Sequence, residues 1–148
     1  MASSAPGTLV VSASYEGGEG IGEARALARE FLADVQAVHG LPVSDRVMGT
    51  VQLVVSELVT NAHKYAPGPY ALTLAIREGA VEVTVWDGEP AVPMARAADT
   101  GRIGQHGMEI VMAVCRSFEV HREPVGKRVR ATVVLADDPA GNMVGRLI

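Results

Sequence analysis

Residues 51–66 read VQLVVSELVTNAHKYA, and the helix that they predict decides the fold. Apolar residues recur through this region at steps of three or four, which is the period of one buried helix face. Ser44 is a suitable N-cap, and the APGP stretch from Ala66 ends the helix because a proline disfavours helical geometry in the residue before it. The apolar stripe consists of Val47, Val51, Val55, Leu58, Ala62 and Tyr65.

Two polar residues of this helix, Glu57 and Asn61, lie four positions apart, so about 40° separates them around the helix axis. Both project beside the apolar stripe, at the edge of the core, where a cleft can open. An asparagine can give Mg²⁺ a neutral oxygen ligand, and a glutamate beside it can orient or deprotonate an attacking hydroxyl. The alternative is that both are ordinary residues of a helix surface.

The rest of the chain predicts an α+β domain. Alternating apolar residues indicate strands, and a 3.6-residue period indicates helices. Helices on one face of a mostly antiparallel sheet would bury both kinds of amphipathic element. We expect strands at 8–15, 70–77, 81–86, 118–122 and 128–135, and further helices at 22–39 and 107–115. Arg128 and Arg130 are expected on the solvated face of an edge strand, where charge discourages aggregation.

Asp87 directly follows the apolar strand VEVTVW at residues 81–86. A carboxylate at the end of a buried strand can accept a hydrogen bond from the exocyclic amine of a purine. The Asp-Gly pair formed with Gly88 is also a common turn signal, so this aspartate can equally mark the end of the strand.

A long stretch without a regular period, residues 87–106, leads into glycines at the start of the next predicted helix. Gly101, Gly104 and Gly107 would let backbone N–H groups approach a phosphate at the helix N-terminus, or they form a linker. His106 can contact a phosphate or be a solvated loop residue.

Length, charge and composition argue against a membrane-spanning protein and against a nucleic-acid-binding protein. The chain has 148 residues, a formal net charge of −4 and one cysteine, Cys115. This length fits one compact domain, which we place at 8–136 between a disordered leader (1–7) and a flexible tail (137–148). No apolar run approaches the roughly 20 residues that cross a bilayer, and the acidic balance argues against a broad nucleic-acid surface. We therefore expect a cytoplasmic protein that binds neither membrane nor nucleic acid directly.

Taken together, the motif order resembles the GHKL superfamily of gyrase, Hsp90, histidine kinases and MutL. Within it, the chain looks most like actinobacterial anti-sigma-factor serine/threonine kinases. The resemblance runs from about Thr8 to Leu135, and residues 51–66 match the N box of the family. It implies the Bergerat fold, a two-layer α/β sandwich with a mixed, mostly antiparallel sheet, helices on one face and an ATP lid.

The same resemblance implies a role for each motif residue. Asn61 would be the Mg²⁺ ligand and Glu57 the general base, with Lys64 where some relatives contact phosphate. Asp87 would bind adenine, and the second glycine box, with Gly104 and Gly107, would close over the phosphates of ATP. Within that box His106 and Met108 are also expected to contact the nucleotide.

One motif departs from the family. Its first glycine box reads Asp-x-Gly-x-Gly, whereas this chain has Glu89 and Ala91 at the two glycine positions and Pro90 between them. Glu89 adds negative charge near an anionic nucleotide, and Pro90 stiffens the segment. This departure favours weaker or absent ATP binding.

Two functions follow as hypotheses. The first is an ATP- and Mg²⁺-dependent serine/threonine kinase that phosphorylates a small antagonist protein, as an anti-sigma-factor-type regulator. The second is a non-catalytic module of the same fold that sequesters a sigma factor or another regulator. A homodimer is implied by the resemblance in both cases.

Overall fold

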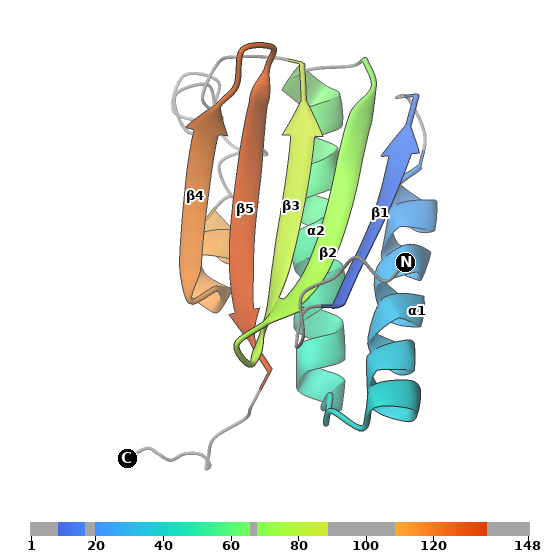
Figure 1. Ribbon diagram of the computed structural model, residues 1–148. Helices are drawn as coiled ribbons and strands as arrows, with labels where there is room; N and C mark the ends of the chain where they lie inside the picture. Colours follow the sequence, from blue (N-terminus) through green and yellow to red (C-terminus); the bar gives the residue numbers. More distant parts are fainter. Residues whose placement is uncertain (1–8, 17–19, 66–67, 89–108, 136–148) are drawn as a thin grey trace.

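The computed structural model describes residues 9–16, 20–65, 68–88 and 109–135. Within these ranges the chain forms two layers, a twisted sheet and a helical layer that covers one of its faces (Figure 1). The α+β architecture expected from the sequence is confirmed. The predicted leader, the ATP lid and the C-terminal tail lie outside the described residues.

The sheet has five strands in the order β1-β2-β3-β5-β4, and all four pairings are antiparallel. Glu78 and Gly79 join β2 to β3 in a tight turn, in which both residues have positive φ, 53° and 77°. The strands are β1 (Leu9–Tyr15), β2 (Tyr70–Arg77), β3 (Ala80–Asp87), β4 (Ser117–Arg122) and β5 (Lys127–Val134).

Two long helices, α1 (Ile21–His39) and α2 (Asp45–Tyr65), form most of the helical layer. Helix α1 ends at Gly40, whose φ of 71° is the left-handed conformation that glycine adopts readily. Helix α2 begins after Ser44, whose Oγ accepts a hydrogen bond from the N–H of Val47 at 3.1 Å. The start of α2 therefore follows the expected capping residue, and a further short helix covers residues 109–114.

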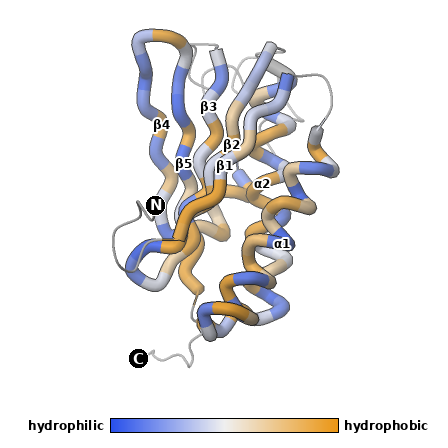
Figure 2. Tube along the Cα trace, turned by 45° about the vertical axis from the view of Figure 1, so that its right-hand side comes forward, coloured by the Kyte–Doolittle hydropathy of each residue, from blue (hydrophilic) through white to orange (hydrophobic). Residues whose placement is uncertain are grey.

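The core lies between the two layers and is almost entirely aliphatic. Alternate residues of each strand point toward the helices, and the apolar stripe of α2 faces them from Val47 to Ala62. Figure 2 shows hydrophobic stretches along the helices and the central strands, whereas β4 carries more hydrophilic residues. Fully buried side chains include Leu32, Val47, Val51, Val55, Leu72, Leu74 and Val83, each of which stabilises the fold by about 1.5–3 kcal/mol through burial.

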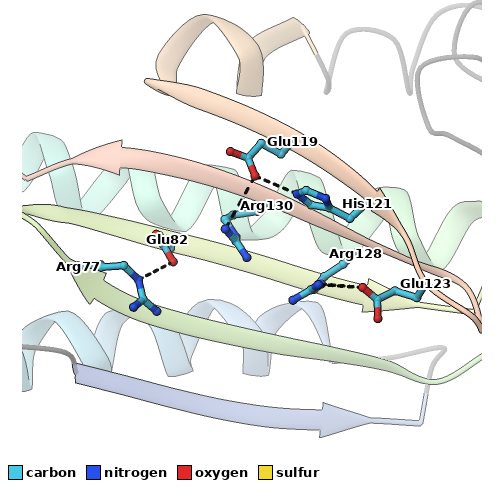
Figure 3. A network of polar contacts seen from close by, with 7 residues as sticks. All are labelled: Arg77, Glu82, Glu119, His121, Glu123, Arg128 and Arg130. Carbon is cyan, nitrogen blue, oxygen red and sulfur yellow. Dashed lines mark hydrogen bonds and ion pairs between the residues drawn. The ribbon is translucent and has the colours of Figure 1, made fainter. Parts of the chain in front are cut away.

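The other face of the sheet carries ion pairs instead of helices (Figure 3). Glu119 accepts a hydrogen bond from His121 at 3.0 Å and lies 3.8 Å from Arg130, and Arg128 pairs with Glu123 at 2.9 Å. The expectation of an edge strand for the two arginines is wrong, because β5 lies between β3 and β4. Their predicted solvent-facing orientation holds for Arg128, whose side chain is 43% exposed.

No helix within the described part of the chain is both long and apolar enough to span a membrane.

Candidate functional site

Asn61 is a buried polar residue on the last turns of α2. It is 8% exposed, and its Oδ1 atom has no hydrogen-bond partner among the described residues. An unsatisfied buried acceptor costs about 1–3 kcal/mol, and most buried polar atoms in proteins have a protein, water or ion partner. The oxygen of Asn61 is therefore available to a ligand, and its chemistry suits a hard divalent cation.

Glu57 lies one turn before Asn61 on the same side of α2. It is half-buried, while its neighbour Leu58 is buried in the core. The structure thus places the carboxylate where the sequence predicts it, at the boundary between core and solvent. In this position it can reach a hydroxyl group that approaches from solution.

Asp87 ends β3 on the face that the helices cover, and it is 1% exposed. The Lys127 Nζ atom donates hydrogen bonds to both carboxylate oxygens, at 2.9 Å to Oδ1 and 3.1 Å to Oδ2. The two residues are direct partners across β3 and β5, and both side chains are 2% exposed. Asp87 is therefore more than a turn residue, since it forms a buried ion pair.

Lys127 is not among the site residues predicted from the sequence. A lysine at the start of an apolar strand has no local signal that distinguishes it from a solvated residue. Only the pairing register, which places it opposite Asp87, shows that the two charges meet. The burial of Lys127 by itself implies such a partner, because an isolated buried charge is costly.

A row of polar residues ends the helix-facing side of the sheet. Tyr15, Tyr70, Asp87 and Lys127 follow one another across β1, β2, β3 and β5 in the pairing register. The rings of the two tyrosines are stacked with centroids 5.1 Å apart. Burial raises the pKa of Tyr15, and the charge of Glu23 adds to that rise. Figure 1 shows the C-terminal turns of α2 at this same end of the sheet, and Asn61 belongs to these last turns of the helix.

Two glycines fit closely against this polar row. Gly20, the N-cap of α1, has a φ of 110°, and a Cβ there would lie 2.6 Å from the hydroxyl of Tyr70. Gly126 has a φ of 80°, and a Cβ there would overlap the backbone of Asp87. Both positions therefore require glycine for space as well as for conformation.

The other predicted site residues fall at the margin of the described structure. Lys64 lies on the last turn of α2. The helix at 109–114 follows the predicted second glycine box and is packed on the core through Val111, which is fully buried. The residues expected to contact the nucleotide from that box, Gly104, His106, Gly107 and Met108, lie outside the described residues.

The chain matches a known protein family. The model of the histidine kinase-like ATPase domain family matches residues 22–133. The chain therefore belongs to this family, and the resemblance to the GHKL superfamily is confirmed. A search of curated proteins found no match.

The fold is shared with a solved structure. The RsbU and RsbW domains of Rv1364c from Mycobacterium tuberculosis align with a TM-score of 0.60 and 20% identity. That alignment covers 86% of this chain and 32% of the other, so the chain spans about a third of that structure. The histidine kinase domain of a blue-light activated kinase from Erythrobacter litoralis EL346 aligns with a TM-score of 0.48 and 20% identity, over 76% of this chain and 61% of the other.

Proposed function

We propose that this domain binds ATP with Mg²⁺ and transfers the γ-phosphoryl group to a serine or threonine of a small antagonist protein. In this role it would be an anti-sigma-factor-type regulator. Family membership supports nucleotide binding, and the shared fold with a structure that contains an RsbW domain is consistent with a regulatory kinase. The observation that carries the proposal is the buried oxygen of Asn61, which has no partner within the described part of the chain.

Asn61 is the residue that would hold the metal. Its Oδ1 is a neutral oxygen donor, and Mg²⁺ retains positions for water and phosphate oxygens when a protein supplies few ligands. Bound Mg²⁺ would neutralise negative charge on the transferring phosphates. Binding of an ion or ordered water would also remove the cost of leaving Oδ1 unsatisfied.

Glu57 would accept the proton of the serine or threonine hydroxyl as the hydroxyl oxygen attacks the γ-phosphorus and ADP leaves. The half-buried carboxylate is on the same helix side as Asn61, so one rigid helix would position both groups. Because protein groups contribute little covalent chemistry to phosphoryl transfer, most of the rate enhancement would come from this positioning.

The remaining contacts to ATP complete the proposal. Asp87 would accept a hydrogen bond from the adenine amine at the end of the sheet. Lys64 and the second glycine box, with Gly104, His106, Gly107 and Met108, would contact the phosphates from the other side.

A binding experiment tests the metal assignment. We expect Asn61→Ala to weaken binding of Mg–ATP by about tenfold or more, the loss that corresponds to one good ligand. Thr60→Ala, an exposed neighbour on the same helix, is the matched control and should bind as the wild type does. Calorimetric titrations with Mg²⁺ and with EDTA measure both effects. Equal affinity of Asn61→Ala and wild type in Mg²⁺ would contradict the assignment.

A transfer experiment tests the kinase activity. The wild type, incubated with γ-labelled ATP and an antagonist protein encoded by a neighbouring gene, should label that protein on serine or threonine. Glu57→Gln should lower the transfer rate at least 100-fold, as loss of a general base commonly does, without weakening ATP binding. Glu30→Gln, on the exposed face of α1, should leave the rate unchanged. Label transfer by Glu57→Gln at the wild-type rate would exclude a base role for Glu57.

A second candidate function is a non-catalytic module that sequesters a sigma factor or another regulator, alone or as a homodimer. The ion pair between Asp87 and Lys127 favours this alternative, because the adenine-binding carboxylate already has a strong partner. The side chains at Glu89 and Ala91 favour it as well. In this case a sigma factor would bind with the same affinity in Mg–ATP and in EDTA, and no label would be transferred.

A further inference from the structure

We propose that Lys127 is a specificity-determining residue of the nucleotide site. Its ammonium group competes with the amino group of the base for the carboxylate of Asp87, so the site discriminates poorly between adenine and guanine nucleotides. This inference rests on the proposed function, in which Asp87 faces the base, and it adds how that contact is controlled.

The contacts of Lys127 make it a strong competitor. One ammonium group donates to both oxygens of Asp87, at 2.9 and 3.1 Å, and both side chains are 98% removed from solvent. Hydrogen bonds in which the donor or the acceptor is ionised are roughly twice as strong as those between neutral groups, and here both partners are ionised. The exocyclic amine of adenine is a neutral donor. It is therefore the weaker competitor for the lone pairs of Asp87, of which a carboxylate has about four.

Backbone contacts of β3 and of the turn before β5 fix the positions of Asp87 and Lys127. Asp87 and Lys127 are direct partners in the antiparallel ladder. The turn before Lys127 packs on the end of β3 through Gly126, which has no space for a side chain beside Asp87. Trp86 Nε1 also donates a hydrogen bond to the carbonyl oxygen of Val125 at 2.9 Å, which ties the same turn to β3. The ion pair is therefore built into the fold.

The pair changes what the site offers to a base. A carboxylate alone accepts hydrogen bonds and so prefers the amine of adenine to the O6 carbonyl of guanine. With Lys127 beside it, the site presents a donor next to an acceptor, and the ammonium group can donate to a carbonyl oxygen. The site consequently loses the preference for adenine that a carboxylate without an ammonium partner would give.

Calorimetric titration of Mg–ADP and Mg–GDP tests this inference. We expect the wild type to bind the two within threefold of each other. Lys127→Met should bind Mg–ADP about tenfold more tightly than the wild type and Mg–GDP no more tightly, since a hydrogen bond to a charged group contributes at least this factor. Simple attraction between a cation and an anionic nucleotide predicts the opposite, a weaker complex after the lysine is removed.

Arg128→Met is the matched control. It removes the same charge from the neighbouring position, but its partner is Glu123 on the open face of the sheet. We expect it to leave the ratio of the two affinities at the wild-type value. A change of the ratio in Arg128→Met equal to that in Lys127→Met would overturn the inference, because net charge would then explain both.

Lys127→Arg is a second variant that can be measured if Lys127→Met does not fold. The guanidinium group retains the charge and can pair with Asp87, so a ratio within threefold is expected again. A preference of the wild type for Mg–ADP greater than threefold overturns the role of Lys127 and leaves the proposed function standing. The absence of nucleotide binding in the wild type and every folded variant overturns both.

Discussion

Lys127 and Arg128 are neighbours on β5, and they show what the two faces of the sheet do to the same kind of contact. Each residue pairs with a carboxylate at 2.9 Å. The side chains of the first pair are 2% exposed, whereas those of Arg128 and Glu123 are 43% and 29% exposed. Alternation along the strand points one cation into the end of the core and the next into solvent.

The difference in exposure means that distance alone does not rank the stability contributions of these ion pairs. An exposed pair contributes little, because water and salt screen it and both side chains lose freedom. In a buried pair, the attraction between the charges roughly offsets the cost of desolvating both, so the net contribution to stability is small. The loss of either partner nevertheless leaves an uncompensated buried charge. The buried pair is thus a fixed chemical feature of the site, and the exposed pair is a surface contact.

The largest predicted effect is that of breaking the buried pair. Lys127→Met should lower the free energy of unfolding by about 3–5 kcal/mol, the usual cost of an uncompensated buried charge. Urea denaturation followed by the fluorescence of Trp86, the single tryptophan, measures the loss. The double variant Asp87→Asn with Lys127→Met should recover most of it. Failure to recover would mean that packing of the lysine stem, and not charge, carries the effect.

Gly126→Ala tests whether the close approach of the turn to the backbone of Asp87 stabilises the buried pair. Its positive φ alone should cost about 1–3 kcal/mol, and the overlap of the new Cβ with Asp87 should add to that. Gly79→Ala is the control, since Gly79 has a similar φ of 77° but nothing within 4 Å of an added Cβ. Equal losses in thermal denaturation would show that the close approach to Asp87 does not constrain the strand.

Breaking the exposed pair should have a smaller effect. Arg128→Met is expected to change the free energy of unfolding by less than about 1 kcal/mol, and the change should shrink further in high salt. Urea titrations at low and high ionic strength provide the measurement. A loss as large as that in Lys127→Met would contradict the distinction between the two faces.

The smallest effect concerns Glu119 on the same open face. The hydrogen bond from His121 is the main cause that lowers the pKa of Glu119 below its ordinary value of 4.5, and the charges of Arg130 and His121 add to this shift. A lowered pKa in the folded state stabilises the fold above pH 4.5, and this contribution is lost as the pH falls through the lowered pKa. In His121→Ala, the carboxyl titration observed by NMR should move toward higher pH, and an unchanged midpoint would rule out this hydrogen bond.

Much of the fold could be predicted from local signals. The apolar stripe of α2, the Ser44 cap and the Gly40 end each depend on neighbours within a few residues. The placement of Asn61 at the edge of the core follows from the same helical period. The expected bounds of the strands likewise lie within one residue of the observed bounds.

The position of β5 in the sheet could not be predicted in this way. Its alternation of arginines with apolar residues looks the same in an edge strand as in an inner strand with one open face. Strand order depends on contacts between distant segments, and the insertion of β5 between β3 and β4 is such a contact.

Local sequence patterns specify the helices and strands, the helix that carries Glu57 and Asn61, and the family to which the chain belongs. The contact between Lys127 and Asp87 follows only from the tertiary structure, because forty residues of chain separate them and the register of two strands brings them together. The tertiary structure also shows that the Asn61 oxygen is buried without a partner among the described residues. Local periodicity specifies which side of an element faces the core, whereas burial and charge pairing depend on what packs against that side.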